Sequence, residues 1–578
     1  MPTPTERRAY EHWKQLSGLV HRFRVTGEAT ASNPALQQAV DSDPDGIFSP
    51  AFLLWTGDNF LQEARFAEAL DAYRQVADRY RDRTFGGRSW AGIALEQQAT
   101  CHEALEETDE AIGALQRASR AQGDDRADAW FRYEIGRVAE AAGRDDEAVR
   151  SFRQAADSSD EAPRGEVSIP DVARRAADRL ESDRAWVRPS VNELASEVTG
   201  ALRAGDGDRL RRLASPTHFS VGLLGSERQF VETERTLDLF IEELANSDVS
   251  ANPAALHGSG GKLYLETRGW NGRLFNDSVT LLLSRTRDGF EWSGAALRML
   301  PKEDGLDFPD IDLPHEDPPE LPKDPPAGSE VPGSTPVTPA DLHMKSPWPK
   351  GEHFRGGGII PFSAQLALFA SIAASWGPFA GFAFATQLLI ASLASPCGFG
   401  PGGLWYGQPT THVNRDVFAI DFARFVQGVP FLLDAFGKPV LAVAPGFVTF
   451  RINSSPTGDP TMANEVDIAH ITQEEIFIGI IIEYLTGHKT TPKYTSEYLH
   501  LDGPNLIPVS VGMFVQQGQR LGRVDDTGLS VSHHLHFSLH DRDLPTATDS
   551  VRPTPMDGQS LNDWDDGRCL FSTNVPIP

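Results

Sequence analysis

The sequence predicts a multidomain protein with an all-α helical-repeat N-terminal region, a small α+β middle domain, and a strand-rich C-terminal domain that carries an apolar helical insertion. An Ala-rich helical pattern indicates the first region, at 1–187, and two helices followed by alternating strands indicate the second, at 188–301. A segment dense in Pro and acidic residues at 302–344 separates them from the last domain, at 345–578. A length of 578 residues fits about three to four domains.

The composition excludes several classes of protein. Lys and Arg number 53 against 81 Asp and Glu, so the net charge is −28. We therefore expect no nucleic-acid partner, because phosphate binding needs clustered basic residues. Cys101, Cys397 and Cys569 are too few and too scattered for a disulfide scaffold or a Cys-rich zinc finger. The first residues lack the apolar core of a Sec signal peptide, so we expect any export to use another route.

Three segments of the N-terminal region share a small alanine followed four residues later by a large side chain. The alanines recur at spacings of 42 and 37 residues. This pattern resembles tetratricopeptide repeats, whose unit of about 34 residues stacks helix pairs; a plain Ala-rich bundle is the alternative. The resemblance implies a groove for a protein partner and no catalytic cluster. The positions are Ala69 and Tyr73, Ala111 and Leu115, and Ala148 and Phe152.

The middle domain opens with a helix, a Gly-Asp turn and a second helix, and continues with strands that alternate apolar and polar residues. Its opening resembles ketosteroid-isomerase-like cone domains. We expect a structural or binding role, because no acid–base pair stands out. The segment that follows, 302–344, should be a semi-rigid spacer, since Pro favours extended backbone and like charges repel.

An uncharged stretch lies near the start of the C-terminal domain. No Asp, Glu, Lys or Arg occurs in the 59 residues between Arg355 and Arg415, and residues 359–403 are rich in Ala, Leu and Phe. Gly377 and Pro378 divide this insertion into halves that are each short for a bilayer span of about 20 residues. A hairpin in a membrane or interface, a single kinked span and an apolar hairpin packed on its own domain are the three readings.

The segment HHLHFSLH, from His533 to His540, predicts a strand that carries a pair of histidines. Strand alternation places His534 and His536 on one side, while Leu535 and Phe537 face the core. Two imidazoles on one face can meet a single metal ion. Taken alone, such a pair is more often a surface strand, so the context has to decide.

Further motifs supply that context. Together with the histidine pair they resemble the lysostaphin-like (LytM-type) zinc metallopeptidases, which cleave peptide bonds in bacterial peptidoglycan. The resemblance covers about 347–543 and implies a mainly antiparallel β domain with a groove. In chain order the matching elements are Ala419-Ile420-Asp421-Phe422, Gly437-Lys438-Pro439-Val440, Tyr498-Leu499-His500-Leu501, Gly518-Gln519 with Leu521-Gly522, Thr527-Gly528, and His534-Leu535-His536-Phe537.

The resemblance also implies the role of each site residue. His412, Asp421 and His536 would hold one Zn²⁺ per chain, which suits a three-ligand site with an open fourth position. The metal would activate a water for attack on the scissile carbonyl. His500 and His534 would flank that water as general base and as donor to the developing oxyanion.

Two features depart from the family pattern. The usual spacing is His-x-x-x-Asp, whereas His412 and Asp421 are nine positions apart. Asp416 stands at the usual spacing but outside the Ala-Ile-Asp-Phe strand, so we prefer Asp421, with His470 as the fallback ligand. The second departure is the apolar insertion at 359–403, which falls in a segment that normally runs quickly to the first histidine.

The leading interpretation is therefore a zinc metalloendopeptidase that acts on peptidoglycan peptides, at an envelope or extracellular site. Two alternatives remain open at this point. The chain could be a catalytically inactive relative that binds cell wall or regulates another hydrolase. It could instead be an interaction scaffold in which the repeats bind a protein partner. Membrane contact through 359–403 is a further expectation.

Overall fold

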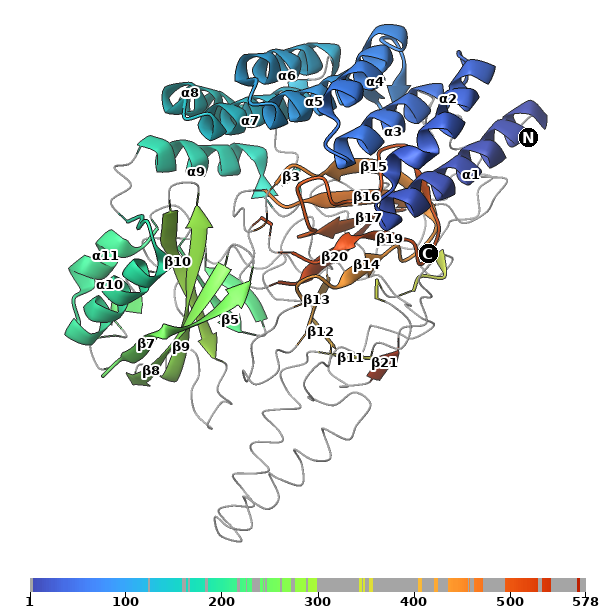
Figure 1. Cartoon of the computed structure of the whole chain (residues 1–578). Helices are drawn as coiled ribbons and strands as arrows, with labels where there is room; N and C mark the ends of the chain where they lie inside the picture. The colour runs from blue at the N-terminus through green and yellow to red at the C-terminus, as the bar shows by residue number, and fades with distance from the viewer. Residues whose placement is uncertain are drawn as a thin grey trace.

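A computed structural model of the chain gives the positions of most helices and strands (Figure 1). The structure describes the following ranges of residues. They are 4–122, 125–158, 163–164, 167–181, 186–215, 219–224, 226–230, 237, 240–242, 244, 247–259, 262–271, 276–286, 289–298, 342–345, 347–348, 353–356, 404–407, 420–424, 435–455, 457, 462–470, 494–525, 527–528, 533–541 and 569–571.

The N-terminal region is helical, with antiparallel helices stacked in sequence order (Figure 1). Two short β hairpins, β1–β2 (Thr84–Phe85 and Arg88–Ser89) and β3–β4 (Pro163–Arg164 and Val167–Ser168), interrupt the helices. The helices are α1 (Pro4–Thr26), η1 (Ala29–Ser32), α2 (Asn33–Ser42), α3 (Ser49–Gln62), α4 (Phe66–Arg79), α5 (Trp90–Ala104), α6 (Thr108–Gln122), α7 (Asp125–Ala141), α8 (Asp145–Ala156) and α9 (Ile169–Glu181).

The predicted helical repeats are confirmed, and glycines explain how each pair closes. A Cβ on Gly57 of α3 would lie 2.4 Å from the ring of Tyr73 on α4, and a Cβ on Gly136 of α7 would lie 2.6 Å from the ring of Phe152 on α8. Each glycine stands 16 positions before its aromatic partner. The glycine thus gives the aromatic ring a place against the neighbouring helix, which lets the two helices approach closely.

The middle domain is α+β, as predicted. Helices α10 (Val191–Ala204) and α11 (Gly207–Leu213) precede a six-stranded sheet of order β6-β5-β10-β9-β8-β7, in which β5 and β10 pair in parallel. Trp292, Phe219 and Phe240 pack edge to face in its core. The strands are β5 (Ser220–Leu224), β6 (Ser226–Phe230), β7 (Ser250–Ser259), β8 (Lys262–Asn271), β9 (Asn276–Thr286) and β10 (Gly289–Arg298).

The C-terminal domain is built on a mainly antiparallel sheet of order β18-β15-β16-β17-β20-β13-β12-β11-β21, which confirms the expected fold class. Strands β14 and β19 form a small separate ladder. The strands are β11 (His353–Gly356), β12 (Leu404–Gly407), β13 (Ile420–Arg424), β14 (Pro439–Leu441), β15 (Gly446–Ile452), β16 (Glu465–His470), β17 (Tyr494–Leu499), β18 (Phe514–Val515), β19 (Arg520–Arg523), β20 (Leu535–Asp541) and β21 (Cys569–Phe571).

The helical region and the C-terminal sheet share one continuous hydrophobic core, with the helices lying over the strands (Figure 1). The ring of Trp13 on α1 lies 5.8 Å from that of Phe514 on β18. Phe85, between α4 and α5, lies 5.9 Å from Phe447 on β15. The two regions are therefore packed as one unit, although several hundred residues separate them in the sequence.

Two expectations fall on parts of the chain outside the described residues. The spacer at 302–344 has only its last three residues described, and the apolar insertion at 359–403 has none. The insertion joins β11 to β12, which are parallel neighbours in the sheet. Among the residues with a described position, no helix is long and apolar enough to cross a bilayer. Membrane contact by the insertion stays a prediction.

Candidate functional site

Strands β13 and β20 bring one predicted metal ligand opposite another. Their antiparallel register pairs Asp421 directly with His536. Directly opposed residues project from the same face of a sheet, with Cβ atoms about 5 Å apart. Residues one position away, Phe422 and Phe537, project from the other face and are buried in the hydrophobic core. The backbone register therefore places positions 421 and 536 on the face opposite to Phe422 and Phe537.

The two predicted catalytic histidines, His500 and His534, lie beside His536. The last residue of β17, Leu499, is paired with His536, so His500 follows at the same end of the sheet. The ring centroid of His500 is 4.5 Å from that of His534 and 6.2 Å from that of His536. All three imidazoles are at most 1% exposed. The structure thus brings three of the five predicted site side chains into one buried cluster.

Backbone geometry sets the orientation of His500. Its φ is +61°, in the left-handed region that is uncommon for residues with a Cβ. The ring Nδ1 lies 2.6 Å from the carbonyl oxygen of Thr527, and a carbonyl can only accept. Nδ1 therefore carries the proton, and the lone pair of the neutral ring is on Nε2. That tautomer suits a general base whose working atom is Nε2.

Thr527 is held in turn by two buried contacts. Its Oγ1 donates to the carbonyl oxygen of Leu501 at 3.1 Å and accepts from the backbone N–H of Asn464 at 2.9 Å. The amide of Asp525 donates to the carbonyl oxygen of His500 at 2.7 Å. The carbonyl oxygen of His500 is thus bonded to Asp525, and its ring is bonded to Thr527. Because both partners belong to one loop, the positions that the imidazole can take are limited.

The remaining predicted residues are placed as follows. His412 and Asp416 lie outside the described residues, and Asp421 is described by its backbone alone. The fallback ligand His470 ends β16 and is paired with Tyr494, the first residue of β17. The last residue of that strand, Leu499, is five positions beyond Tyr494, which is roughly 16 Å of extended chain. The structure does not bring His470 to the histidine cluster.

Buried hydrogen bonds give His470 a structural place instead. Its Nδ1 lies 3.1 Å from the carbonyl oxygen of Pro445, and its Nε2 lies 2.6 Å from Ser496 Oγ. Burial lowers the pKa of His470 to about 4, so its ring is neutral at physiological pH. Both ring nitrogens therefore link β16 to its neighbours, one to the residue before β15 and the other to β17.

The donor set fits zinc. Structural and catalytic zinc sites use imidazole nitrogens and carboxylate oxygens, and a catalytic site keeps one position for water. In the strand register Asp421 stands opposite His536, so the pair contains one residue of each kind. A third ligand has to come from outside this pair, and His412 precedes β13 in the chain.

Polar residues continue along the same face of the sheet beyond His536, and the sequence reasoning missed them. Ser538 and His540 follow on β20, and Glu497 lies opposite Ser538 on β17. His540 Nε2 is 3.2 Å from Glu497 Oε2. The signal was present in the alternation of EVDIAH and YTSEYL. Among described side chains, the acidic group with ligand atoms within 4.8 Å of one another is Glu465, Asp467 and Glu497.

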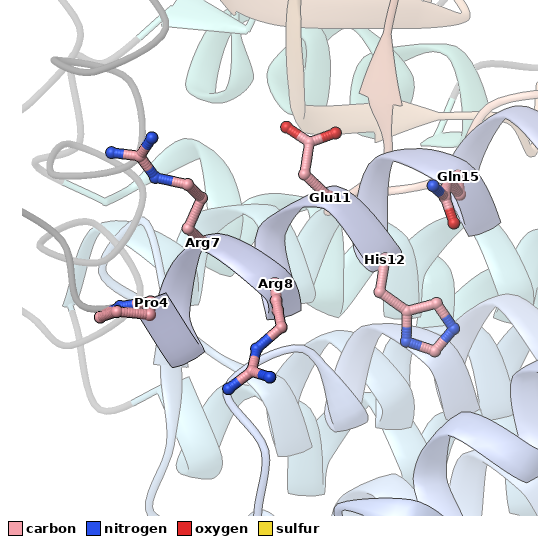
Figure 2. A pocket seen from close by; sticks show the side chains of 6 residues that line it. All are labelled: Pro4, Arg7, Arg8, Glu11, His12 and Gln15. Carbon is pink, nitrogen blue, oxygen red and sulfur yellow. The ribbon is translucent and has the colours of Figure 1, made fainter.

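A separate hollow of about 870 Å³ lies on the outer side of α1 (Figure 2). Its lining side chains include Arg7, Arg8, Glu11 and His12, and the two arginines point to different sides of the helix. None of the predicted site residues lines it.

Comparison with known families finds a peptidase family in the C-terminal domain. The model of peptidase family M23 matches residues 424–548. This region includes His500, His534 and His536, while Asp421 and His412 precede it. The C-terminal region thus carries a peptidase domain, and the resemblance predicted from its motifs is confirmed. No curated protein matches the chain.

Solved structures similar to parts of the chain fall into two groups. A zinc-containing peptidase from Vibrio cholerae is 24% identical, with a TM-score of 0.15, over 24% of this chain and 30% of that one. The catalytic domain of lysostaphin from Staphylococcus simulans is 21% identical, with a TM-score of 0.16, over 24% and 76%. A tetratricopeptide repeat protein from Parabacteroides merdae is 13% identical, with a TM-score of 0.24, over 35% and 71%.

Proposed function

We propose that the C-terminal domain is a zinc metalloendopeptidase that hydrolyses peptide bonds in peptidoglycan. One Zn²⁺ per chain would be held by His412, Asp421 and His536. The observation that carries the proposal is the pairing of Asp421 with His536 on one sheet face, with the rings of His500 and His534 beside them. The buried cluster of His500, His534 and His536, with Asp421 opposite His536 in the register, supports this assignment.

The chain's own groups account for the proton transfers of such a reaction. Zinc, when bound, polarises the scissile carbonyl and lowers the pKa of water. His500 holds its lone pair on Nε2, because Nδ1 donates to Thr527, and Nε2 can accept the proton of the attacking water. His534, whose ring lies 4.5 Å from that of His500, would donate to the developing oxyanion.

The substrate class rests on two supports. The motif pattern resembles the LytM-type enzymes, and the family model of M23 peptidases matches the region that holds three of the histidines. Both point to a peptide bond of the bacterial cell wall. The repeats provide a second part of the protein that could contact a protein partner.

Digestion of purified peptidoglycan tests the proposal. The full-length protein should release new amino groups, a chelator should stop the release, and added zinc should restore it. His536→Ala should be inactive, and His12→Ala, an exposed histidine on α1, should match the unaltered protein. Release that persists in His536→Ala would refute the assignment. Stoichiometric zinc without any release would favour the catalytically inactive relative.

A further inference from the structure

Helices α1 and α3 hold one segment of the C-terminal domain, residues 507–514, by its backbone. Both helices lie over the C-terminal strands (Figure 1). Hydrogen bonds recur along the segment, as they do when a protein binds an extended peptide. They run from Gln62 Nε2 to Ile507 O (3.1 Å), Arg24 Nη1 to Pro508 O (3.2 Å), Trp55 Nε1 to Val511 O (3.0 Å), Trp13 Nε1 to Gly512 O (2.8 Å) and Phe514 N to Ser17 Oγ (3.1 Å).

The other side of the segment is bonded to the sheet. The amide of Gly512 donates to the carbonyl oxygen of Val448 on β15 at 2.9 Å, and the amide of Val448 donates to that of Met513 at 2.9 Å. The segment is therefore enclosed between the two helices and β15. The position of the segment therefore depends on the helices and on the sheet.

Buried charges lock this arrangement. Asp58 of α3 lies 3.3 Å from Arg451 of β15 and 4.0 Å from Arg24 of α1. Arg24 also donates to Ser510 Oγ at 2.6 Å. The two guanidinium groups and the carboxylate are each at most 5% exposed, and buried charges are tolerated only when they remain paired. The group joins α1, α3, the segment and the sheet.

The enclosed segment begins seven positions after His500. The intervening loop, 501–506, is tied at its start by the amide of Asp502, which donates to Arg523 O at 2.8 Å, and near its end by the amide of Asn505, which donates to Asn453 O at 3.0 Å. His500 itself has a φ of +61°, a conformation that persists only when the surroundings impose it. Fixing residues 507–514 fixes the point where the loop ends.

We infer that α1 and α3 together form the binding site of the chain's own residues 507–514, and that this contact positions His500. Arg24 and Trp55 are then positioning residues, which act on His500 through the segment. The occupant follows from the bonds themselves, so a foreign peptide would have to displace it from this part of the helical region. The kinetic consequence rests on the proposed function, whereas the binding of the segment does not.

Arg24→Met in the full-length protein tests the inference, with Arg22→Met as the matched control, since Arg22 is exposed on the same helix. Hydrogen–deuterium exchange should become about tenfold faster or more in peptides covering 500–505 and 510–515. With peptidoglycan as substrate, kcat should fall by about tenfold or more, because small displacements of catalytic groups are costly. KM and zinc content should not change, and Arg22→Met should behave as the unaltered protein.

Two outcomes would overturn the inference. Unchanged exchange in 500–505 would show that the contact of α1 and α3 with residues 507–514 does not restrain the loop after His500. Faster exchange with an unchanged kcat would show that this loop does not position His500. If Arg24→Met fails to fold, Trp55→Phe decides on the same readouts, because it keeps an aromatic ring and removes one donor. An unaltered protein without activity would end the proposed function alone, since exchange in 500–505 would still decide the inference.

Discussion

Replacing Asp58 by Asn should strongly destabilise the unit formed by the helical region and the C-terminal domain. The carboxylate is 2% exposed and accepts from Tyr73 Oη at 2.6 Å. It also lies 3.3 Å from Arg451 and 4.0 Å from Arg24, and it is hydrogen-bonded to Ser510. An amide of the same shape keeps the packing but removes the negative charge. The buried guanidinium groups of Arg24 and Arg451 would then lose the negative charge that they share.

The magnitude follows from the cost of uncompensated buried charge. Removing one partner of a buried ion pair costs about 3–5 kcal/mol. The entropy of unfolding is about 2.1 cal/mol/K per residue, so in a cooperative unit of roughly 400 residues each kcal/mol lowers Tm by about 1 °C. The Tm of the unit should therefore fall by roughly 3–6 °C. Burial lowers the pKa of Arg24 to about 10 in the unaltered protein, where the carboxylate of Asp58 raises it, so the guanidinium is charged at pH 7 and has this carboxylate as its partner.

Thermal and urea unfolding of the full-length protein, followed by tryptophan fluorescence, would measure this loss. Trp13 and Trp55 are buried at the contact and report on it directly. Asp71→Asn is the control, because its carboxylate is 71% exposed in a surface pair with Arg74, and such pairs contribute at most about 1 kcal/mol. A shift for Asp58→Asn no larger than that of Asp71→Asn would refute the reasoning.

His536→Ala should lose zinc, measured by metal analysis, whereas His500→Ala should keep it and lose about 10²–10⁴-fold in rate; zinc loss in the latter would contradict the division of roles. Burial lowers the pKa of His470 from 6.5 to about 4. The unfolded chain therefore protonates first, and urea titrations should show stability falling from pH 6.5 to 4 by up to about 3 kcal/mol, less steeply in His470→Gln. Gly136→Ala should lower Tm, because its Cβ would lie 2.6 Å from a buried ring. Gly113→Ala, which meets only the end of an arginine at 3.4 Å, should hold or raise Tm.

Part of the fold could be predicted because it depends on local periodicity. The alanines Ala69, Ala111 and Ala148 recur with helical surroundings, and all three are fully buried on the helices where the pattern placed them. The alternation around His536 likewise predicted a strand whose other face, with Leu535 and Phe537, lies in the core. Such patterns follow from the geometry of a single element, so neighbours along the chain are sufficient to reveal them.

The sequence predicted which residues form the candidate site but not how they are arranged. Resemblance to a family suggested His500 and Asp421, but neither the pairing of Asp421 with His536 nor the bond from His500 to Thr527 O can be read from spacing. Strand register is set by the packing of the whole sheet. The acidic group on β16 and β17 was missed because its members are distant in sequence and meet only through that register.

Residue type and short-range period were sufficient to predict which segments are helical, which are strands, and which side chains can ligate a metal. The enclosure of residues 507–514 by α1 and α3, and the contacts of Asp58 with both Arg24 and Arg451, could be seen only in the folded protein. These contacts include the bond from Trp55 Nε1 to Val511 O, which joins residues 456 positions apart. They exist because burying the apolar faces of both regions in one core leaves their backbone and charged groups to satisfy one another.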